Sequence, residues 1–454
     1  MRASKRTIVG VLALSAGTVC GIAIAGGSAF SATYGKGRAH AMRYEPPANI
    51  EAPVDPVESP PVEATDGPIV QLALLLDTSN SMDGLIDQAK ARLWSIVNEM
   101  SKASHDGRPA QIRVALYEYG NDGVPSAVGH VRQRTPFTTD LDILSEQLFS
   151  LRTDGGSEYC GWVVGDAVTE LDWLFQGDAP RDVRRSTLEG QTEAALDRAI
   201  DGRHAPGSHP APVVRIIVIA GNEPFTQGTV PHTETIAQAR ARGITVNTIF
   251  CGPRAEGEAT GWSRGAELGG GRYANIDPDT RDWAIPTPYD GDLEALNTKL
   301  NTTYLPYGED GHRFAFRQGQ ADRQNRGIGA LYERVKSKAS KGYQNTSWDL
   351  VDAARRKDFD IAELDDAALP AKMRGKTIDA KLEIIRIAAD ERVRVTADIA
   401  EISVRRDEFI AEKAGKMRGL GAAIIGALRD QVRAAGLTFE AARPAPETGG
   451  SDSD

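Results

Sequence analysis

The sequence predicts a doubly wound, mostly parallel α/β sheet followed by an α-helical, partly coiled-coil extension. Between about residues 70 and 277, apolar runs of strand length alternate with stretches of helical spacing, as in a parallel sheet with helices on both faces. The runs VQLALLLD (70–77) and VVRIIVIAG (213–221) are almost entirely apolar, which is typical of strands buried on both faces. After residue 328, charged residues become dense and only a narrow apolar stripe remains.

The elements of the sheet follow in order after the first strand. A polar turn leads into a helix from Leu85 to Met100. We expect further strands at 112–120, 129–137, 213–221, 243–252 and 270–277, and helices at 140–151 and 159–175. Because charges interrupt the 129–137 run, this strand is predicted to lie at an edge. Residues 176–211 are too long for an ordinary connection and are predicted to be a surface insertion, with one helix near Thr192 to Ile200.

The two ends of the chain differ from this central segment. Residues 1–31 carry Arg2, Lys5 and Arg6, then a long apolar stretch and an A-x-S sequence, which indicates a signal peptide. An uncleaved N-terminal anchor is the alternative, and it would be the protein's only contact with a membrane. We therefore expect a periplasmic or secreted protein. Residues 32–67 are predicted to be a Pro/Glu-rich disordered linker, and residues 438–454 a disordered tail.

The C-terminal part of the chain is predicted to be helical. Residues 281–327 form a connecting segment, with a helix and a turn at 289–308, and residues 328–437 form a helical or coiled-coil region. Its apolar stripe, near heptad spacing, consists of Leu382, Ile385, Ala389, Ile399, Ile402 and Phe409. Such a stripe suits a long helix hairpin or coiled coil, which either packs on the first domain or self-associates.

The overall charge and the missing motifs exclude several classes of function. The formal net charge of −10 argues against nucleic acid and anionic membrane surfaces as partners. The sequence has no phosphate loop, no zinc-ligand spacing and no nucleophile elbow. We therefore predict that the protein is not an enzyme.

The turn after the first strand carries the clearest chemical signal. Asp77, Ser79 and Ser81 stand at alternate positions between the strand and the next helix, so all three side chains can face the same side. Open α/β sheets bind ligands at the carboxyl ends of such central strands. Carboxylate and hydroxyl oxygens suit a hard cation such as Mg²⁺. A helix N-cap is the alternative interpretation, but a cap requires only one of these residues.

The DxSxS turn, the order of the strands and the closing GGRYANI together resemble a von Willebrand factor type A (VWA) domain over about residues 68–280. Further phrases resemble a group of exported bacterial proteins with such a domain: DTSNSMDGLIDQAK, ALYEYGNDG, GGSEYCG, AGNEPFTQG and VNTIFCG. The resemblance implies that Asp77, Ser79 and Ser81 belong to a metal-ion-dependent adhesion site (MIDAS). In this family the hydroxyl ligands leave the cation electrophilic, so that it binds a carboxylate of a partner protein.

The resemblance also suggests ligands from two further loops. The family's second loop supplies a threonine after a Gly-Gly pair, and here Ser157 follows such a pair, with Thr153 as the fallback. In the third loop the sequence departs from the family, because Gly221 stands where the family has an aspartate. We expect Glu223, or less favourably Asn222, to reach the ion directly or through water.

The two cysteines that follow the N-terminal segment lie close to the predicted site. Cys160 starts a helix after the second loop, and Cys251 ends a predicted strand, so they are a candidate disulfide that would brace two loops. Two unpaired buried thiols are the alternative. A catalytic cysteine is the third option, but no histidine can be placed beside Cys160 as its base.

The sequence thus predicts an exported, non-enzymatic, metal-dependent protein-binding module of the adhesion type. The expected cofactor is Mg²⁺, with Mn²⁺ or Ca²⁺ as alternatives, and the expected partner is a protein that offers an acidic residue. Self-association through the helical region is a further expectation. Two alternatives come from other classes: a structural envelope protein with a degraded metal site, and an accessory subunit of an envelope enzyme complex.

Overall fold

The computed structural model describes residues 65–82, 86–176, 208–276, 285–414 and 420–439. All of these belong to one unit of the structure, Tyr44–Asp454. The predicted signal peptide, nearly all of the linker, most of the surface insertion with its predicted helix, and most of the tail lie outside the described residues. In the described ranges, no helix combines the length and apolar character needed to cross a membrane.

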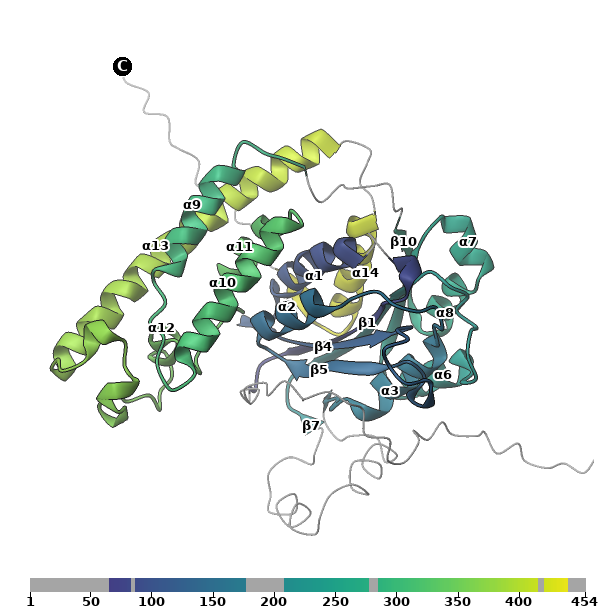
Figure 1. The fold of residues 1–454 in the computed structure, drawn as a ribbon, viewed down its shortest axis with the longest axis horizontal. Helices are drawn as coiled ribbons and strands as arrows, with labels where there is room; N and C mark the ends of the chain where they lie inside the picture. The colour runs from purple at the N-terminus through teal and green to yellow at the C-terminus, as the bar shows by residue number, and fades with distance from the viewer. Residues whose placement is uncertain (1–64, 83–85, 177–207, 277–284, 415–419, 440–454) are drawn as a thin grey trace, which may run out of the picture. The chain divides into compact units, whose positions relative to one another are not determined.

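A six-stranded sheet forms the core of the N-terminal part (Figure 1). Its strands are β1 (Ile69–Asp77), β4 (Gln111–Tyr119), β5 (Arg132–Thr138), β8 (Val213–Gly221), β9 (Thr245–Cys251) and β10 (Gly270–Ile276). They lie in the order β10-β9-β8-β1-β4-β5, and the β4–β5 pair is antiparallel while the other pairs are parallel. This confirms the predicted doubly wound sheet, with the charged 129–137 run at its edge.

The apolar run of β1 is explained by cores on both faces of the sheet. Val70, Leu72 and Leu76 face one core, and Ala73 and Leu75 face the other. The first core is covered by α1 (Ile86–Met100), α2 (Leu141–Ser150) and α14 (Leu420–Ala434). The second is covered by α3 (Cys160–Glu170), α6 (His232–Ala241) and α8 (Trp262–Leu268), which follows the short α7 (Arg254–Ala259). Each buried leucine contributes roughly 1.5–3 kcal/mol.

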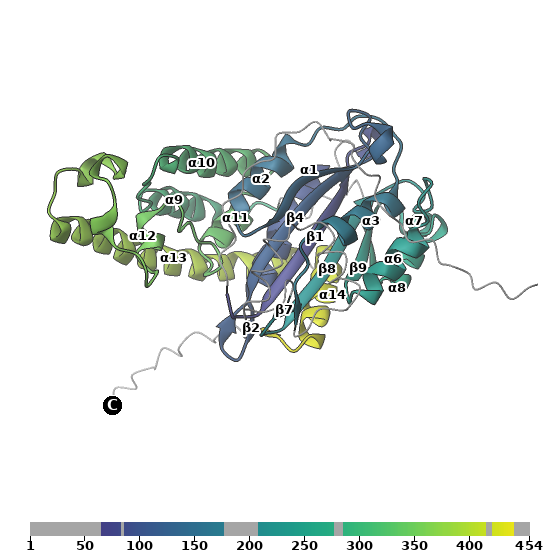
Figure 2. The same cartoon turned by 90° about the horizontal axis from the view of Figure 1, so that it is seen from below.

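The helical extension begins earlier than predicted. It contains α9 (Asp290–Asn301), α10 (Gly311–Gly327), α11 (Leu331–Lys338), α12 (Leu350–Ala353) and the 37-residue α13 (Ile378–Ala414), with 3-10 turns at Ile361–Glu363, Asp366–Ala368 and Ala371–Met373. In both views α9 lies along α13 (Figure 2). The segment 281–327, predicted as a connection with one helix at 289–308, therefore holds α9 at the expected place and α10 in addition.

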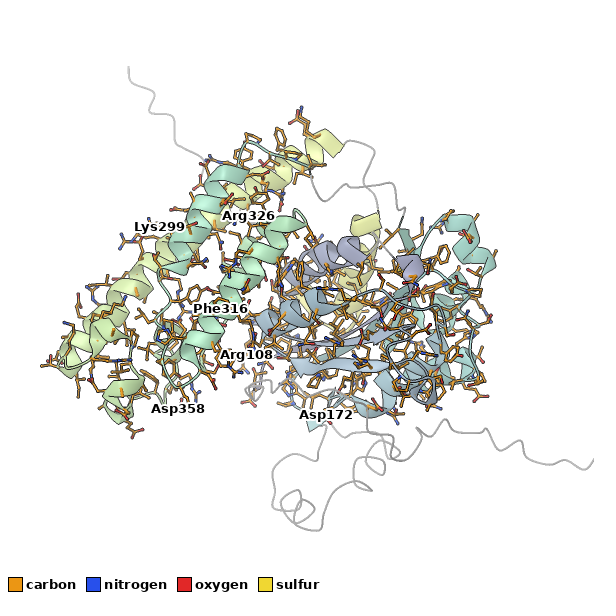
Figure 3. All side chains as sticks on the ribbon, viewed as in Figure 1. Arg108, Asp172, Lys299, Phe316, Arg326 and Asp358 are labelled. Carbon is orange, nitrogen blue, oxygen red and sulfur yellow. The ribbon has the colours of Figure 1, made fainter. Side chains whose placement is uncertain are left out.

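Polar side chains explain why α10 has no apolar periodicity. Its buried side chains include Gln318, Asp322 and Asn325, whereas Phe316 is 63% exposed (Figure 3). The buried amides and carboxylate take part in hydrogen bonds with neighbouring helices and with the α/β domain. A helix that buries polar residues gives no hydrophobic stripe in the sequence.

The chain returns to the α/β domain at its C-terminal end. α14 contacts α1 and β10, and it lies beside α1 in Figure 1. β11 (Thr438–Phe439) then pairs with β2 (Ala103–His105), which also pairs with β3 (Arg108–Pro109). The predicted helical region, 328–437, is thus divided: its last helix completes a face of the sheet, and the extension is an insertion between β10 and α14.

A buried polar network fastens the extension to the α/β domain. Arg334 of α11 lies 2.6 Å from Asp142 of α2 and 2.7 Å from Asp322 of α10. The Tyr343 hydroxyl donates to Asp142 Oδ2 (2.6 Å), and Trp94 Nε1 of α1 donates to Asn325 Oδ1 (2.6 Å). Of the two expected roles of the helical region, packing on the first domain is therefore confirmed.

Candidate metal centre

The predicted site lies at the carboxyl edge of the sheet, where three loops meet. Loop 1 (77–82) follows β1, loop 2 (152–159) precedes α3, and loop 3 (221–227) follows β8. Backbone hydrogen bonds fix loop 1 against loop 2: Asn80 N donates to Gly155 O (3.0 Å), and Asp154 N donates to Thr78 O (3.0 Å). The parallel register of β1 and β4 also places Asp77 beside Tyr119.

Asp77 is fully buried, and only one of its two carboxylate oxygens accepts a hydrogen bond from a described residue. Its Oδ1 accepts a hydrogen bond from Ser79 N (2.8 Å), whereas Oδ2 is buried and has no hydrogen-bond partner among the described residues. An orphaned buried acceptor costs roughly 1–3 kcal/mol, and more when it is charged. A bound proton or a nearby cation would stabilise such an oxygen.

Hydroxyl and amide oxygens gather beside this carboxylate. Ser79 Oγ lies 2.7 Å from Ser81 Oγ, and Ser81 Oγ donates to Asn222 Oδ1 at 3.0 Å. Ser79 is buried and Ser81 is exposed, so the cluster is open to solvent on the Ser81 side. The structure therefore brings Asp77, Ser79, Ser81 and Asn222 together at this edge of the sheet.

Glu158 is a residue of this site that the sequence reasoning missed. Its side chain is fully buried just before α3, with Oε1 3.5 Å from Ser81 Oγ. Its Oε2 accepts from Glu223 N (3.2 Å), and its own backbone N–H donates to Gln227 Oε1. Burial, and after it the neighbouring Glu158, raises the pKa of Asp77 well above its usual value. The centre therefore contains two carboxylates.

Gly221, at the position of the family's third-loop aspartate, has no room for a side chain. A Cβ atom on this residue would lie 2.4 Å from the Tyr119 hydroxyl oxygen and 3.1 Å from Asp77 Cβ. Gly120 is similarly constrained, since its φ is 77° and a Cβ there would lie 2.8 Å from Asp77 Oδ1 and 2.9 Å from Glu158 Cγ. These two glycines let the backbone pass closely around the carboxylate pair.

The remaining predicted ligands lie on the same loops with different roles. Glu223 contributes its backbone, since its N–H holds Glu158 and its carbonyl accepts from Trp262 Nε1 (2.8 Å). Burial and the nearby Glu158 raise the pKa of its side chain. Ser157 is half-buried directly before Glu158, and Thr153 is half-buried earlier in loop 2. Metal ligation by Glu223, Ser157 or Thr153 stays a prediction.

The candidate disulfide is not formed. Cys160 and Cys251 are both free and buried, and they belong to the two different cores on opposite faces of the sheet. Two side chains separated by a sheet cannot reach disulfide geometry. Burial also raises the pKa of both thiols, which disfavours the reactive thiolate form. Cys160 instead packs with its Sγ 3.8 Å from the Tyr119 hydroxyl.

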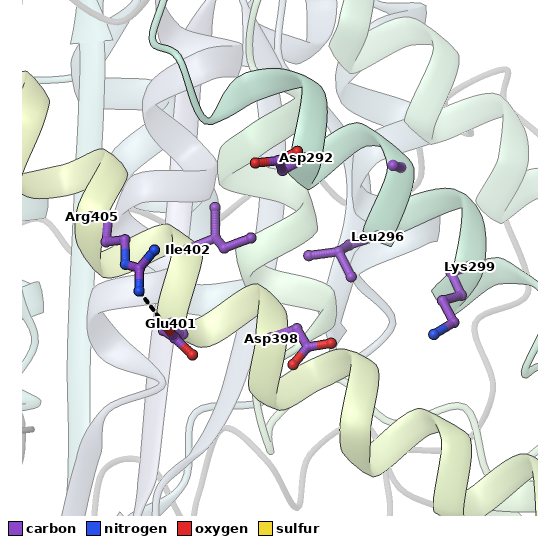
Figure 4. A pocket seen from close by; sticks show the side chains of 8 residues that line it. Asp292, Leu296, Lys299, Asp398, Glu401, Ile402 and Arg405 are labelled. Carbon is purple, nitrogen blue, oxygen red and sulfur yellow. Dashed lines mark hydrogen bonds and ion pairs between the residues drawn. The ribbon is translucent and has the colours of Figure 1, made fainter. Parts of the chain in front are cut away.

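Other parts of the described chain offer no competing centre. Among the described residues, no three His, Cys, Asp or Glu side chains come together as metal ligands. The candidate centre is not such a group, because it combines two carboxylates with hydroxyls. A groove between α9 and α13 is lined by charged residues, some of which form ion pairs (Figure 4). Arg405 pairs with Glu401 (2.5 Å), and Lys299 pairs with Glu391 (2.7 Å).

The strand order and the position of the site identify the type of fold. Numbered along the chain, the six strands lie in the order 3-2-1-4-5-6, the third is antiparallel, and the DxSxS turn ends the central first strand. The domain is of the VWA type. The VWA-type domain thus consists of residues 69–276 together with α14, which the extension separates from β10.

Comparisons with known proteins find only distant similarity. No family model and no curated protein matches the chain. Similar solved structures include proximal thread matrix protein 1 from the mussel byssus (12% identity, TM-score 0.29, 47% of this chain and 43% of that chain). A second is the SpRpn10 VWA domain, with 10% identity and a TM-score of 0.29 over 46% of this chain and 89% of that chain. A third is the vWF domain of the type V pili tip protein Mfa5 from Porphyromonas gingivalis, with 16% identity and a TM-score of 0.26 over 47% of this chain and 91% of that chain. Because all three TM-scores are below 0.5, these similarities support no conclusion about the chain.

Proposed function

We propose that this chain is an exported, non-enzymatic protein-binding module of the adhesion type that works through a divalent cation. The observation that carries the proposal is the fully buried Asp77, whose Oδ2 has no hydrogen-bond partner in the described part of the chain. Ser79 and Ser81 lie at the same edge of the sheet and add two hydroxyl oxygens. Hard cations such as Mg²⁺, Mn²⁺ or Ca²⁺ prefer this set of oxygen donors.

The described donors would hold the ion and leave one side open to a partner. Asp77, Ser79, Ser81 and Asn222 would supply oxygens from loops 1 and 3. Because Ser81 is exposed, a partner can approach from its side. A bound cation supplies an electrophilic position for an oxygen ligand, and an acidic side chain of another protein is the ligand that we propose.

Gly221 favours one alternative, a structural envelope protein whose metal site is degraded. In that case Asp77 would remain protonated, and the protein would not respond to metal. The other alternative, an accessory subunit of an envelope enzyme complex, would use the helical extension as its working part. The proposed metal site gives one role to the two hydroxyl side chains of loop 1 and to the unpartnered Asp77 oxygen, as ligands of the same ion.

Thermal unfolding of the chain in EDTA and in excess Mg²⁺ or Mn²⁺ tests the proposal. A ligand at 100 times its dissociation constant stabilises the folded state by about 2.7 kcal/mol, or several degrees in a domain of this size. We expect the wild-type protein to show this shift. Asp77→Asn, which preserves the shape of the side chain, should lose it. A wild-type protein with no shift at millimolar metal would instead indicate the degraded site.

A further inference from the structure

We propose that Glu158 supplies the second carboxylate of the metal centre, in place of the third-loop aspartate that this chain lacks. The inference rests on the proposed function, because it concerns the same cation. It moves an acidic ligand from loop 3 to loop 2, which the sequence pattern of the family does not suggest.

The first support is that position 221 cannot provide the acid. The Tyr119 hydroxyl occupies the space next to Gly221, and this hydroxyl is itself held by donation to Ala220 O (3.0 Å). A side chain at residue 221 would also approach Asp77 Cβ and the Trp262 ring at 3.1 Å each. An acidic ligand must therefore come from another position.

The second support is that Glu158 is held in place on several sides. Its Oε2 accepts from Glu223 N at 3.2 Å, and its Oε1 lies 3.5 Å from Ser81 Oγ. Its backbone N–H donates to Gln227, so loop 3 contacts both its main chain and its side chain. A carboxylate held in this way needs little rearrangement to bind an ion, which favours affinity.

The third support is the unbalanced charge of the pair. Asp77 and Glu158 are both fully buried, and the hydrogen bonds that their side chains accept from described residues come from Ser79 N, Ser81 Oγ and Glu223 N, which are all neutral. Burying two carboxylates side by side is costly unless a positive charge accompanies them. A divalent cation would balance both charges, and Ser79 and Ser81 would add neutral ligands.

Calorimetric titration of the full chain with Mn²⁺ tests the role of Glu158. We expect Glu158→Gln to weaken Mn²⁺ binding by about tenfold or more, since ligand charge strongly affects the affinity of such sites. Glu223→Gln tests the rival ligand, because it changes the acid that the sequence predicts and keeps the backbone N–H that contacts Glu158. We expect its affinity to stay within about twofold of wild type.

The possible outcomes separate this inference from the proposed function. If the wild-type protein binds Mn²⁺ and Glu158→Gln binds it equally well, the inference is wrong while the metal site stands. If Glu223→Gln weakens binding and Glu158→Gln does not, Glu223 is the ligand, as the sequence first predicted. If the wild-type protein binds no Mn²⁺, both proposals fail. Thermal unfolding in EDTA verifies that each variant is folded. For Glu158→Gln we expect an unfolding midpoint at or above that of the wild-type protein.

Discussion

The Tyr119 hydroxyl lies where a side chain at residue 221 would have to be. A Cβ atom on Gly221 would come within 2.4 Å of this oxygen, which is far below any van der Waals contact. Tyr119 is fully buried at the end of β4, and its hydroxyl donates to Ala220 O. This relationship explains in physical terms why loop 3 carries no acid at its first position. It is one reason why we propose Glu158 as the second carboxylate of the centre.

Substitution of Gly221 should therefore destabilise the α/β domain. We expect Gly221→Ala to lower the free energy of unfolding by about 1–3 kcal/mol, the usual cost of an added methyl group in a packed core. Gly156→Ala in loop 2 is the control, because a Cβ there meets nothing within 4 Å. Urea denaturation measures both variants. Equal midpoints for the two would show that the space beside Tyr119 is not closed.

The polar network between α2 and α11 should be essential for stability. We expect Arg334→Met to lower the free energy of unfolding by about 3–5 kcal/mol, because it removes the ion-pair partner of the buried Asp142 and one of the two cations beside the buried Asp322. Arg386→Met is the control, since its ion pairs with Glu383 and Asp390 are exposed on α13 and should contribute little. A small effect of Arg334→Met in urea denaturation would mean that the extension is only loosely attached.

The N-cap of α2 should make stability depend on pH. Asp140 Oδ1 accepts from Asp142 N (2.9 Å) and Ile143 N (3.0 Å), and burial together with Asp142 raises the pKa of Asp140 to about 6. An acid with a raised pKa binds its proton more tightly in the folded state than in the unfolded state. Its contribution to stability therefore increases as pH falls from about 6 to about 4.

Asp140→Asn keeps the cap and removes this titration. Relative to this variant, the wild-type protein should gain up to about 3 kcal/mol of unfolding free energy between pH 7 and pH 4. Urea denaturation of both proteins across this range measures the difference. Parallel pH profiles would show that the Asp140 carboxyl has an ordinary pKa.

Self-association through the helical region stays a prediction, and the structure now shows where to test it. Leu382, Val393 and Val404 of α13 are 46%, 61% and 50% exposed. They recur every 11 residues, a spacing that keeps side chains on one face of a long helix. We expect Val393→Glu to abolish concentration-dependent association in light scattering. Ile387→Glu is the control, because Ile387 is 55% exposed but lies on another face of the helix, and it should leave association intact. A wild-type protein that is monomeric at every concentration would contradict the prediction.

Much of the α/β fold could be predicted because its strands are apolar on both faces. The central strands, the edge position of the charged strand and the DxSxS turn all follow from local sequence. The DxSxS turn can be interpreted locally because Asp77, Ser79 and Ser81 stand on one short segment. Glu158 could not be assigned this way, since its burial depends on loop 2 packing against loop 3. The only sequence signal was an acid directly after the predicted hydroxyl in GGSEYCG.

The errors in the helical part and at the cysteines have similar causes. α10 buries polar residues whose partners lie on other helices, so its sequence lacks an apolar stripe. The return of α14 to the sheet depends on tertiary contacts across the whole extension. Cys160 and Cys251 are close to the same sheet edge in the sequence pattern, but which face each one occupies is decided by the packing of α3 and β9.

The most direct test of the metal centre is an anomalous-scattering measurement on crystals of the protein soaked with Mn²⁺. We predict one peak within about 2.0–2.6 Å of oxygens from both Asp77 and Glu158, with Ser79 or Ser81 also coordinating. A peak bound by Asp77 without Glu158 would contradict the relocated carboxylate. The absence of any peak at loop 1 in millimolar Mn²⁺ would contradict the metal centre itself.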